Sequence, residues 1–140
     1  MYVPSKFRVD DQEKLFAFVR ENSFATVVAQ GGDGAPLASH LPLLLREGEG
    51  GGAVLLGHMA RANPQWRQFA PDREALAVFH GPHGYISPSW YESDQVVPTW
   101  NYAAVHAYGI PQIVESGERI AAIVDETVAE YESGFETPWK

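Results

Sequence analysis

The segment from His58 to Trp66 carries the side chains best suited to hold an anion. Asn63 followed by Pro64 predicts the start of a short helix, because asparagine accepts free backbone N–H groups and proline loses none at the first helical position. Those N–H groups and the guanidinium of Arg61 both favour an anion such as a phosphate. The alternative is a capped surface helix beside an exposed arginine, and the spacing alone favours that alternative.

A second candidate site lies in the aromatic stretch between residues 85 and 108. The segments SPS (87–89) and TWNY (99–102) place hydroxyl and amide groups beside large rings, which suits a planar heterocycle with hydrogen-bonding edges. Aromatic rings equally anchor cores and dimer interfaces, and this is the default interpretation for most of them. The rings concerned are Tyr85, Trp90, Tyr91, Trp100, Tyr102 and Tyr108.

The other common chemistries find no support in the sequence. Histidines stand at positions 40, 58, 80, 83 and 106, and His80 with His83 could share one turn, but no third ligand follows at a characteristic spacing, so we predict no metal site. The chain has no cysteine, no Gly-x-Ser-x-Gly elbow and no Walker loop. No residue is identified as a dedicated catalytic acid, base or nucleophile, so whether the protein is an enzyme stays open.

Length and charge set further limits. The 140 residues, 45% of them hydrophobic, predict one globular domain over residues 1–140. A net charge of −8 disfavours direct binding to duplex DNA. The N-terminus has no apolar signal region, and no apolar run approaches the roughly 18 residues that a membrane span needs. We therefore expect a cytoplasmic protein that does not bind a membrane.

Apolar periodicity and turn residues predict the elements that must position these side chains. Asp10 or Asp11 caps a helix over about 11–21, and Ser116 precedes an amphipathic helix that ends near Tyr131. Pro42 lacks an N–H group, so its strand should carry a bulge or lie at a sheet edge there. The predicted strands are 24–28, 37–45, 53–58, 74–79, 84–86, 100–108 and 112–114, with turns at 31–34, 46–52 and 80–83, a short helix at 65–69 and a long loop at 87–98.

Short strands at hairpin spacing, with helices inserted or at the ends, favour a mainly β fold with flanking helices. The arrangement indicates a small six-stranded antiparallel Greek-key barrel in preference to a parallel α/β sheet.

Six blocks of sequence, in order, resemble the PaiB-type FMN-binding regulators, which belong to the flavin-reductase-like split barrels. The resemblance covers most of residues 1–114. It implies a six-stranded split barrel that forms a homodimer, with flavin mononucleotide (FMN) bound in the groove between protomers. Members of the family usually continue beyond the C-terminal helix, so we expect the family's C-terminal segment to be missing or short here. The blocks are MYVPSKF, ENSFATVV, ASHLPLLL, GHMARANPQW, GPHGYISPSWY and VPTWNYAAVHAYG.

The same resemblance implies three groups of cofactor-binding residues. One is similar to the barrel strand that meets the flavin ring, the second resembles the phosphate-binding turn, and the third would lie near the ring or the partner subunit. Arg67 is the nearest further cation to the second group. The groups are Ser39, His40, Leu41 and Pro42; Gly57, His58, Arg61, Ala62 and Asn63; and Trp100, Asn101 and Tyr102.

Three functions follow as hypotheses. The preferred one is an FMN-binding homodimeric flavoprotein whose flavin could be reduced by a nicotinamide or another donor. The second is a DNA-binding transcriptional repressor, which the acidic charge and the lack of a helix-turn-helix pattern disfavour. The third is a cofactor-free protein-interaction module that keeps the aromatic surface for a protein partner.

Overall fold

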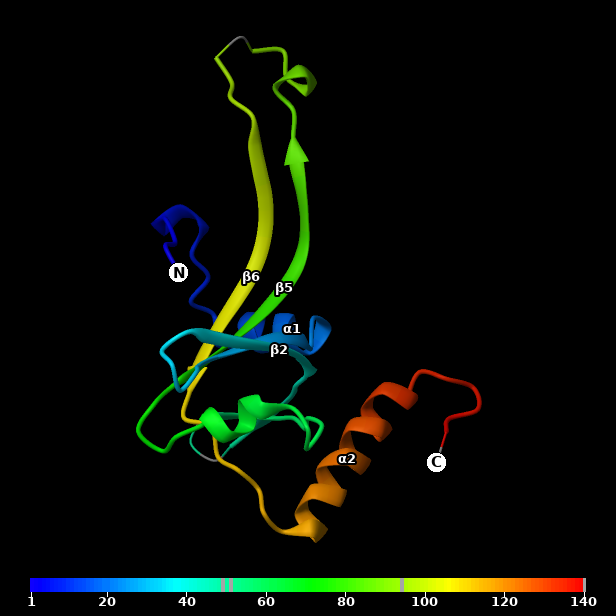
Figure 1. The fold of residues 1–140 in the computed structure, drawn as a ribbon. Coiled ribbons are helices and arrows are strands. Elements are labelled where there is room, and N and C mark those ends of the chain that lie inside the picture. Colours follow the sequence, from blue (N-terminus) through cyan, green and yellow to red (C-terminus); the bar gives the residue numbers. More distant parts are fainter. Residues whose placement is uncertain (49, 51, 94, 140) are drawn as a thin grey trace.

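The computed structural model describes residues 1–48, 50, 52–93 and 95–139, which form two antiparallel sheets and two α-helices (Figure 1). The larger sheet has the strand order β2-β1-β5-β6, and the smaller sheet pairs β3 with β4. The strands are β1 (Phe24–Gln30), β2 (Pro36–Pro42), β3 (Leu44–Glu47), β4 (Ala53–Leu56), β5 (Ala75–Ile86) and β6 (Thr99–Gly109). The helices are α1 (Gln12–Glu21) and α2 (Gly117–Glu132), with 3₁₀ turns η1 (Ser5–Phe7), η3 (Pro64–Gln68) and η4 (Pro88–Trp90).

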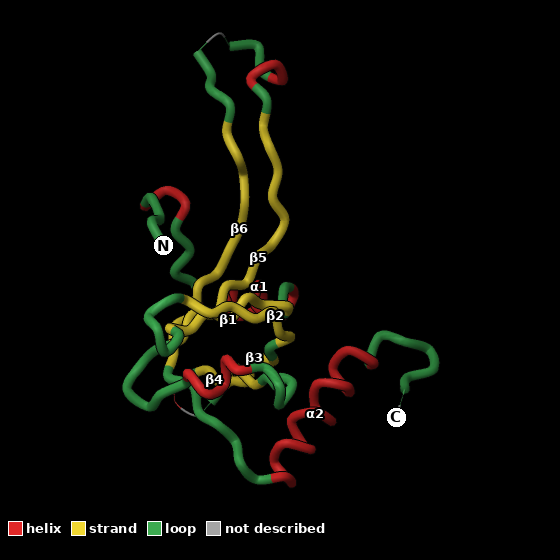
Figure 2. Tube along the Cα trace, viewed as in Figure 1, coloured by secondary structure: helices red, strands yellow, loops and turns green. Residues whose placement is uncertain are grey.

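The predicted mainly β class with flanking helices is confirmed, and six of the predicted strands are present. They lie in two separate sheets, as the strand colouring of Figure 2 shows, and no closed barrel is found among the described residues. Closure into a Greek-key split barrel is therefore not confirmed.

Local capping and turn chemistry explain the first elements. The Asp11 carboxylate accepts the Lys14 backbone N–H at 3.2 Å and caps α1, and this hydrogen bond holds the pKa of Asp11 below its usual value. In the turn between β1 and β2, Gly34 adopts a φ of 84°, which glycine tolerates without strain. The Asp33 carboxylate accepts the Ala35 N–H at 3.0 Å in the same turn. Both the predicted helix and the predicted hairpin are confirmed.

The core lies between the inner face of the larger sheet, the β3–β4 hairpin and α1. Along β1, buried and half-exposed residues alternate, as expected for a strand with one face on the core. Phe79 of β5 is fully buried at the centre. The buried members of the cluster are Val19, Ala25, Val27, Leu43, Leu45, Ala77 and Phe79.

Three strand predictions need correction. The strand predicted at 37–45 is split, because the chain leaves the β1–β2 ladder after Pro42 and the Leu43 N–H donates to the Ser23 carbonyl at 2.9 Å before β3 begins in the other sheet. The turn predicted at 80–83 is wrong, since β5 runs through it with a bulge between His80 and His83. A bulge tolerates Pro82, which has no N–H to donate. The strand predicted at 112–114 is absent.

The paired strands β5 and β6 form an arm. They are hydrogen-bonded from Ala75 and Gly109 to Ile86 and Thr99, and the hairpin extends far beyond the other strands (Figure 1). Two predicted connections reach positions outside the described residues: the turn at 46–52 includes 49 and 51, and the loop at 87–98 includes 94.

Helix α2 is capped as predicted, by the Ser116 hydroxyl, which accepts the Arg119 N–H at 3.3 Å. Ile123 and Thr127 are its buried residues. Polar contacts connect α2 with the body: Arg46 donates to Glu126 at 3.3 Å, and Tyr131 hydrogen-bonds Ser23. Within the described ranges, no helix is long and apolar enough to cross a membrane.

Candidate functional site

The loop after β4 brings two predicted site residues together. Asn63 caps η3, because its side-chain oxygen accepts the Gln65 backbone N–H at 2.9 Å. The amide nitrogen of Asn63 donates to the Ser39 hydroxyl of β2 at 2.8 Å. Ser39 and Asn63, which lie 24 positions apart in the chain, are thus in direct contact.

Gln65 fastens this loop to the sheet. Its side-chain nitrogen donates to the Val27 carbonyl of β1 and to the Leu37 carbonyl of β2, both at 2.9 Å. Only 2% of Gln65 is exposed, and its side-chain oxygen has no hydrogen-bond partner among the residues that the structure describes. The turn that carries Asn63 is therefore held on the inner face of β1 and β2.

Trp66 organises two arginines beside this anchor. Its indole N–H donates to the Arg61 carbonyl at 3.1 Å. The Arg61 guanidinium carbon lies 5.4 Å from the Trp66 ring centroid, and that of Arg67 lies 5.3 Å from it. Such cation–π contacts restrict flexible side chains without neutralising their charge. We name Arg61, Trp66 and Arg67 the arginine cluster.

The arginine cluster has an unusual electrostatic setting in an acidic chain. Among the described residues, Arg61 and Arg67 are the only arginines without a carboxylate within ion-pair distance. The other five pair with acidic side chains: Arg8, Arg20, Arg46, Arg73 and Arg119. Two exposed guanidinium groups on one indole ring, with no carboxylate partner among the described residues, suit an anion such as a phosphate monoester.

Sequence reasoning named Arg61 and Asn63 but missed Gln65 and Trp66 as parts of this site. The available signal was a tryptophan with an arginine on each side, at positions 61 and 67. Gly57 sits tightly here, since a Cβ at that position would lie 2.5 Å from the Leu43 side chain. His58 and Ala62 are exposed. Their assignment to the cofactor stays a prediction.

The remaining predicted residues divide between the two faces of the sheet. Neighbouring residues of a strand point to opposite faces, so His40 faces away from Ser39 and Leu41. Leu41 packs against the core, and Pro42 ends β2. In β6 the same alternation puts Asn101 on the face opposite to Trp100 and Tyr102. The residues predicted to meet the flavin ring thus do not form one cluster within a protomer.

Aromatic and imidazole rings meet on the face that carries His40. The Trp100 indole N–H donates to His83 Nδ1 at 3.2 Å, and their ring centroids are 5.8 Å apart. Tyr85 lies 6.2 Å from Trp100 between centroids. His40 stacks on Phe24 at 6.3 Å and hydrogen-bonds the Thr26 hydroxyl at 3.0 Å. Within the parts of the chain that the structure describes, no three His, Asp or Glu side chains form a possible metal-binding group.

His106 is the titratable group of this face with a perturbed proton affinity. Burial lowers the pKa of His106, and the positive charges of the N-terminal amino group and of His80 lower it further. Its Nδ1 is buried and has no hydrogen-bond partner in the described structure. His106 therefore favours the neutral form.

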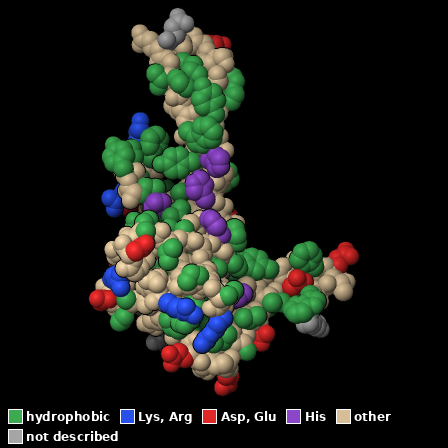
Figure 3. Space-filling view, in the orientation of Figure 1, with side chains coloured by type: hydrophobic (Ala, Val, Ile, Leu, Met, Phe, Trp, Pro, Cys, Tyr) green, Lys and Arg blue, Asp and Glu red, His purple; other side chains and the backbone are tan. Residues whose placement is uncertain are grey.

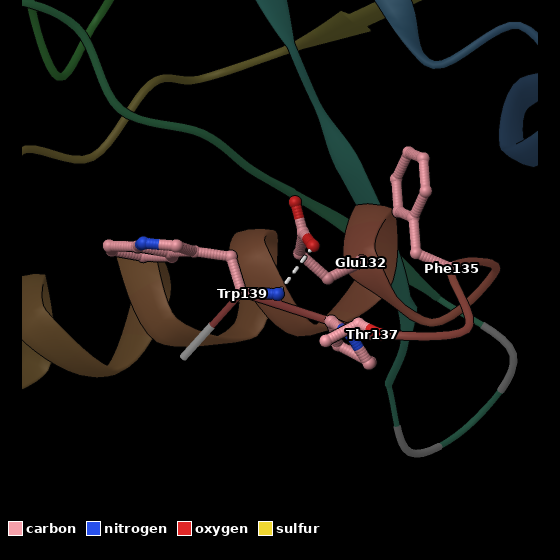
Figure 4. Close-up of a pocket in the computed structure, with 5 residues that line it drawn as sticks. Glu132, Phe135, Thr137 and Trp139 are labelled. Atoms are coloured by element: carbon pink, nitrogen blue, oxygen red, sulfur yellow. Dashed lines mark hydrogen bonds between the residues drawn. The ribbon is translucent and has the colours of Figure 1, made fainter.

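Two surface hollows lie away from the arginine cluster. One, of about 550 Å³, is lined by residues that follow α2, and the Trp139 N–H donates to the Glu132 carboxylate in it at 2.7 Å (Figure 4). The other, of about 430 Å³, lies at the turn end of β1 and β2 and includes Glu74 and Tyr108. Each contains a carboxylate and no basic side chain, so neither suits a phosphate.

The mainly β fold and the exposed arginines agree with the comparisons to known proteins. The chain belongs to the family described as "Putative FMN-binding domain", whose pattern matches residues 1–140. The predicted resemblance to the PaiB-type family is confirmed.

Individual relatives support this assignment. The chain is 43% identical over 138 residues to the protease synthase and sporulation protein PAI 2 of Bacillus subtilis, which covers 99% of this chain and 65% of that protein. It is 38% identical over 81 residues to an uncharacterised protein of Saccharomyces cerevisiae, covering 55% of this chain and 48% of that protein. An uncharacterised protein of Emericella nidulans is 36% identical over 98 residues, covering 51% and 39%. The chain thus spans less than two thirds of each relative's length.

Proposed function

We propose that residues 1–140 act as one FMN-binding domain and that Arg61 and Arg67 hold the flavin phosphate. The observation that carries this proposal is the pair of arginines on either side of Trp66 in the sequence, neither of which has a carboxylate partner within the described part of the chain. A phosphate monoester carries close to two negative charges at neutral pH, so it can pair with both guanidinium groups. Membership of a family described as FMN-binding supports the same ligand.

We further propose that the functional unit is a homodimer with FMN between the protomers. Ser39 and Asn63 lie on the inner side of the sheet, whereas His40, Trp100 and Tyr102 lie on its other face. A site that uses both sets for one flavin needs the second set from another copy. Closure of the six strands into a split barrel belongs to this proposal as well.

When bound, a flavin supplies hydride or single-electron transfer, and the chain supplies binding and orientation. Arg61 and Arg67 would fix the phosphate, Asn63 and Ser39 would hold the turn against β2, and Gln65 would keep that turn in place. The aromatic rings of the arm would exclude water from the flavin ring. We assign no residue as a proton donor or acceptor in a reaction.

A titration with FMN, followed by visible absorbance and flavin fluorescence, tests the proposal. Riboflavin is the matched ligand because it lacks only the phosphate. We expect saturable FMN binding at one flavin per protomer and much weaker riboflavin binding. Arg61→Ala should weaken FMN binding by about 1–3 kcal/mol, the usual loss for a charge-assisted hydrogen bond, with little effect on riboflavin.

Arg73→Ala is the control, since Arg73 is exposed and forms an ion pair with its neighbour Asp72. It should bind FMN like the unmodified protein. Equal affinities for FMN and riboflavin would place the phosphate elsewhere, and no binding of either flavin would favour the cofactor-free interaction module. Sequence-specific DNA binding with a steep salt dependence would instead favour the repressor hypothesis.

A further inference from the structure

The larger sheet carries no fixed charge. None of the residues in β1, β2, β5 and β6 is Asp, Glu, Lys or Arg, although the chain has 10 basic and 18 acidic side chains. The side chains that titrate in this sheet are tyrosines and four of the five histidines. Near neutral pH, the charge state of the sheet therefore depends on histidine alone.

All four histidines of the sheet lie on the same face. Directly opposed residues in antiparallel strands point to the same side, and the register aligns Thr26 with both His40 and Val78, and Val78 with His106. His80 lies two residues beyond Val78 and therefore shares that side. After the bulge, His83 opposes Tyr102. Tyr102 lies an even number of residues from His106 on the same strand, so His83 shares the side of His106. We name this side the histidine face.

The histidine face is open and rich in rings. Its aromatic side chains are more than half exposed, apart from Tyr85 at 50%, while the opposite face forms the core. Histidines gather where the arm leaves the body, with hydrophobic side chains farther along the arm (Figure 3). Exposed surface of this kind is typical of protein–protein interfaces. The aromatic members are Phe24, Tyr85, Trp100, Tyr102 and Tyr108.

Charge identifies the partner that this face suits. Two copies of a chain with net charge −8 repel each other, and a surface without carboxylates is where they can approach at the lowest electrostatic cost. A strongly charged partner would instead bury its charges against groups that cannot pair with them. We infer that the histidine face is where a second copy of this chain docks, and that protonation of its histidines at acidic pH releases that copy. This inference rests on the homodimer of the proposed function.

Three contacts of the histidine face are disturbed when an imidazole takes up a proton. An indole N–H can only donate, so His83 Nδ1 must accept the Trp100 hydrogen bond and loses it on protonation. His80 meets the His83 ring edge-on at 5.5 Å, so both rings cannot be charged without repulsion. His106 faces His80 and the N-terminal amino group.

The strands of the face supply no carboxylate to offset these charges, and Glu74, just before β5, lines a hollow with Tyr108 at one end of the face. His40 contacts Thr26 and Phe24 of β1. From α1, the Phe18 ring approaches β5, where a Cβ at Gly81 would lie 2.7 Å from it. The strand positions of the face contain Tyr hydroxyl groups and no Asp or Glu. Docking a second copy buries the imidazoles further, which disfavours their charged form. Protons taken up by the histidines therefore favour separate protomers, against the opposing loss of net negative charge towards the pI of about 5.0.

Sedimentation velocity of the full chain between pH 8 and pH 5.5, with and without saturating FMN, tests the inference. We expect a dimer at pH 8 and a dimer dissociation constant that rises at least about tenfold towards pH 5.5 as the histidines titrate. His83→Gln combined with His106→Gln should flatten this dependence. Glu13→Gln, which changes one exposed charge on α1, should leave it unchanged. A constant that does not vary with pH would overturn the release by protons while leaving the homodimer intact.

A second pair of variants tests the location of the docking surface. Tyr85→Asp places a carboxylate on the histidine face, and Ala103→Asp places one on the opposite face of the same arm. Both positions are exposed, so both variants should keep the circular dichroism spectrum of the unmodified protein. We expect Tyr85→Asp to be monomeric at pH 8 and Ala103→Asp to remain a dimer. Dimers of equal strength would exclude this face, and a monomer before any substitution would refute the homodimer itself.

Discussion

Replacement of Gln65 by leucine tests whether one buried amide holds the candidate site on the sheet. Leucine has nearly the same volume and donates no hydrogen bond, so the change removes the two 2.9 Å contacts to the Val27 and Leu37 carbonyls with little change in packing. At about 0.5–1.5 kcal/mol of net stabilisation for each hydrogen bond, the loss is about 1–3 kcal/mol.

One term opposes this loss. The side-chain oxygen of Gln65 is buried without a partner, and leucine removes that unsatisfied acceptor. The leucine leaves two carbonyl oxygens without the hydrogen bonds that Gln65 donated, and this loss outweighs the removal of one unsatisfied acceptor. The free energy of unfolding should therefore still fall by more than about 1 kcal/mol. The Gln65→Glu variant should be less stable than Gln65→Leu at pH 7. It should regain stability at pH 5, because a carboxylate buried beside two carbonyl oxygens must take up a proton.

Urea unfolding followed by tryptophan fluorescence measures the effect, with the dependence on urea concentration expected to stay constant. Gln68→Leu is the control in the same turn, because Gln68 makes no side-chain hydrogen bond within the described residues, and it should change stability by less than about 0.5 kcal/mol. If Gln65→Leu costs no more than Gln68→Leu, the amide does not anchor the turn. If it destabilises the protein but leaves FMN affinity intact, the anchoring is unrelated to the cofactor.

Three further predictions concern the core, the arm and the response to acid. Phe79→Ala should lower the free energy of unfolding by about 3–5 kcal/mol in urea, because the ring is fully buried. Gly81→Ala should lower it by about 1–3 kcal/mol, since the new Cβ would lie 2.7 Å from the Phe18 ring, and an unchanged midpoint would mean that the helix shifts freely. The pKa of His106 in the folded protein is below its usual value of 6.5, so the folded state binds fewer protons than the unfolded chain near that pH. The free energy of unfolding is therefore highest above pH 6.5 and falls as the pH drops below it. The melting temperature should therefore decrease from pH 7.5 to pH 5.5, and His106→Gln should reduce that decrease.

Elements specified by neighbouring residues could be predicted from the sequence. The caps at Asp11, Asn63 and Ser116 depend on side chains two or three positions from the N–H groups that they accept. The first hairpin depends on a turn around Gly34. The caps at Asn63 and Ser116 and the hairpin were located correctly, and Asp11 was one of two caps predicted for its helix, because the deciding interaction lies within a few residues.

The errors arise where distant pairing decides the structure. His80 to His83 contains Gly-Pro, a local turn signal, but pairing with β6 on both sides carries the strand through it as a bulge. Pro42 predicted a bulge or a sheet edge, and β2 is an edge strand that ends at Pro42. The transfer of the chain to the other sheet at Leu43 depends on a contact with the distant Ser23, which local patterns do not reveal.

The candidate site shows the same division. The sequence showed that Arg61 lies close to the start of a short helix and that Asn63 caps this helix. The contact between Asn63 and Ser39 and the two carbonyls held by Gln65 join segments more than 20 residues apart. Grouping His40 with Ser39, or Asn101 with Trp100, overlooked the alternation of strand side chains.

Helix α2 fully buries only Ile123 and Thr127, so we expect it to open separately from the sheet. Its links to the body include the Arg46 ion pairs with Glu126 and Glu130 and the hydroxyl contact of Tyr131 with Ser23. Exposed ion pairs contribute little and weaken in salt, so α2 can detach while the sheet stays folded. Amide hydrogens of α2 should exchange with solvent through local opening, faster at high ionic strength, whereas those at the centre of β1 and β5 should exchange only when the whole domain unfolds.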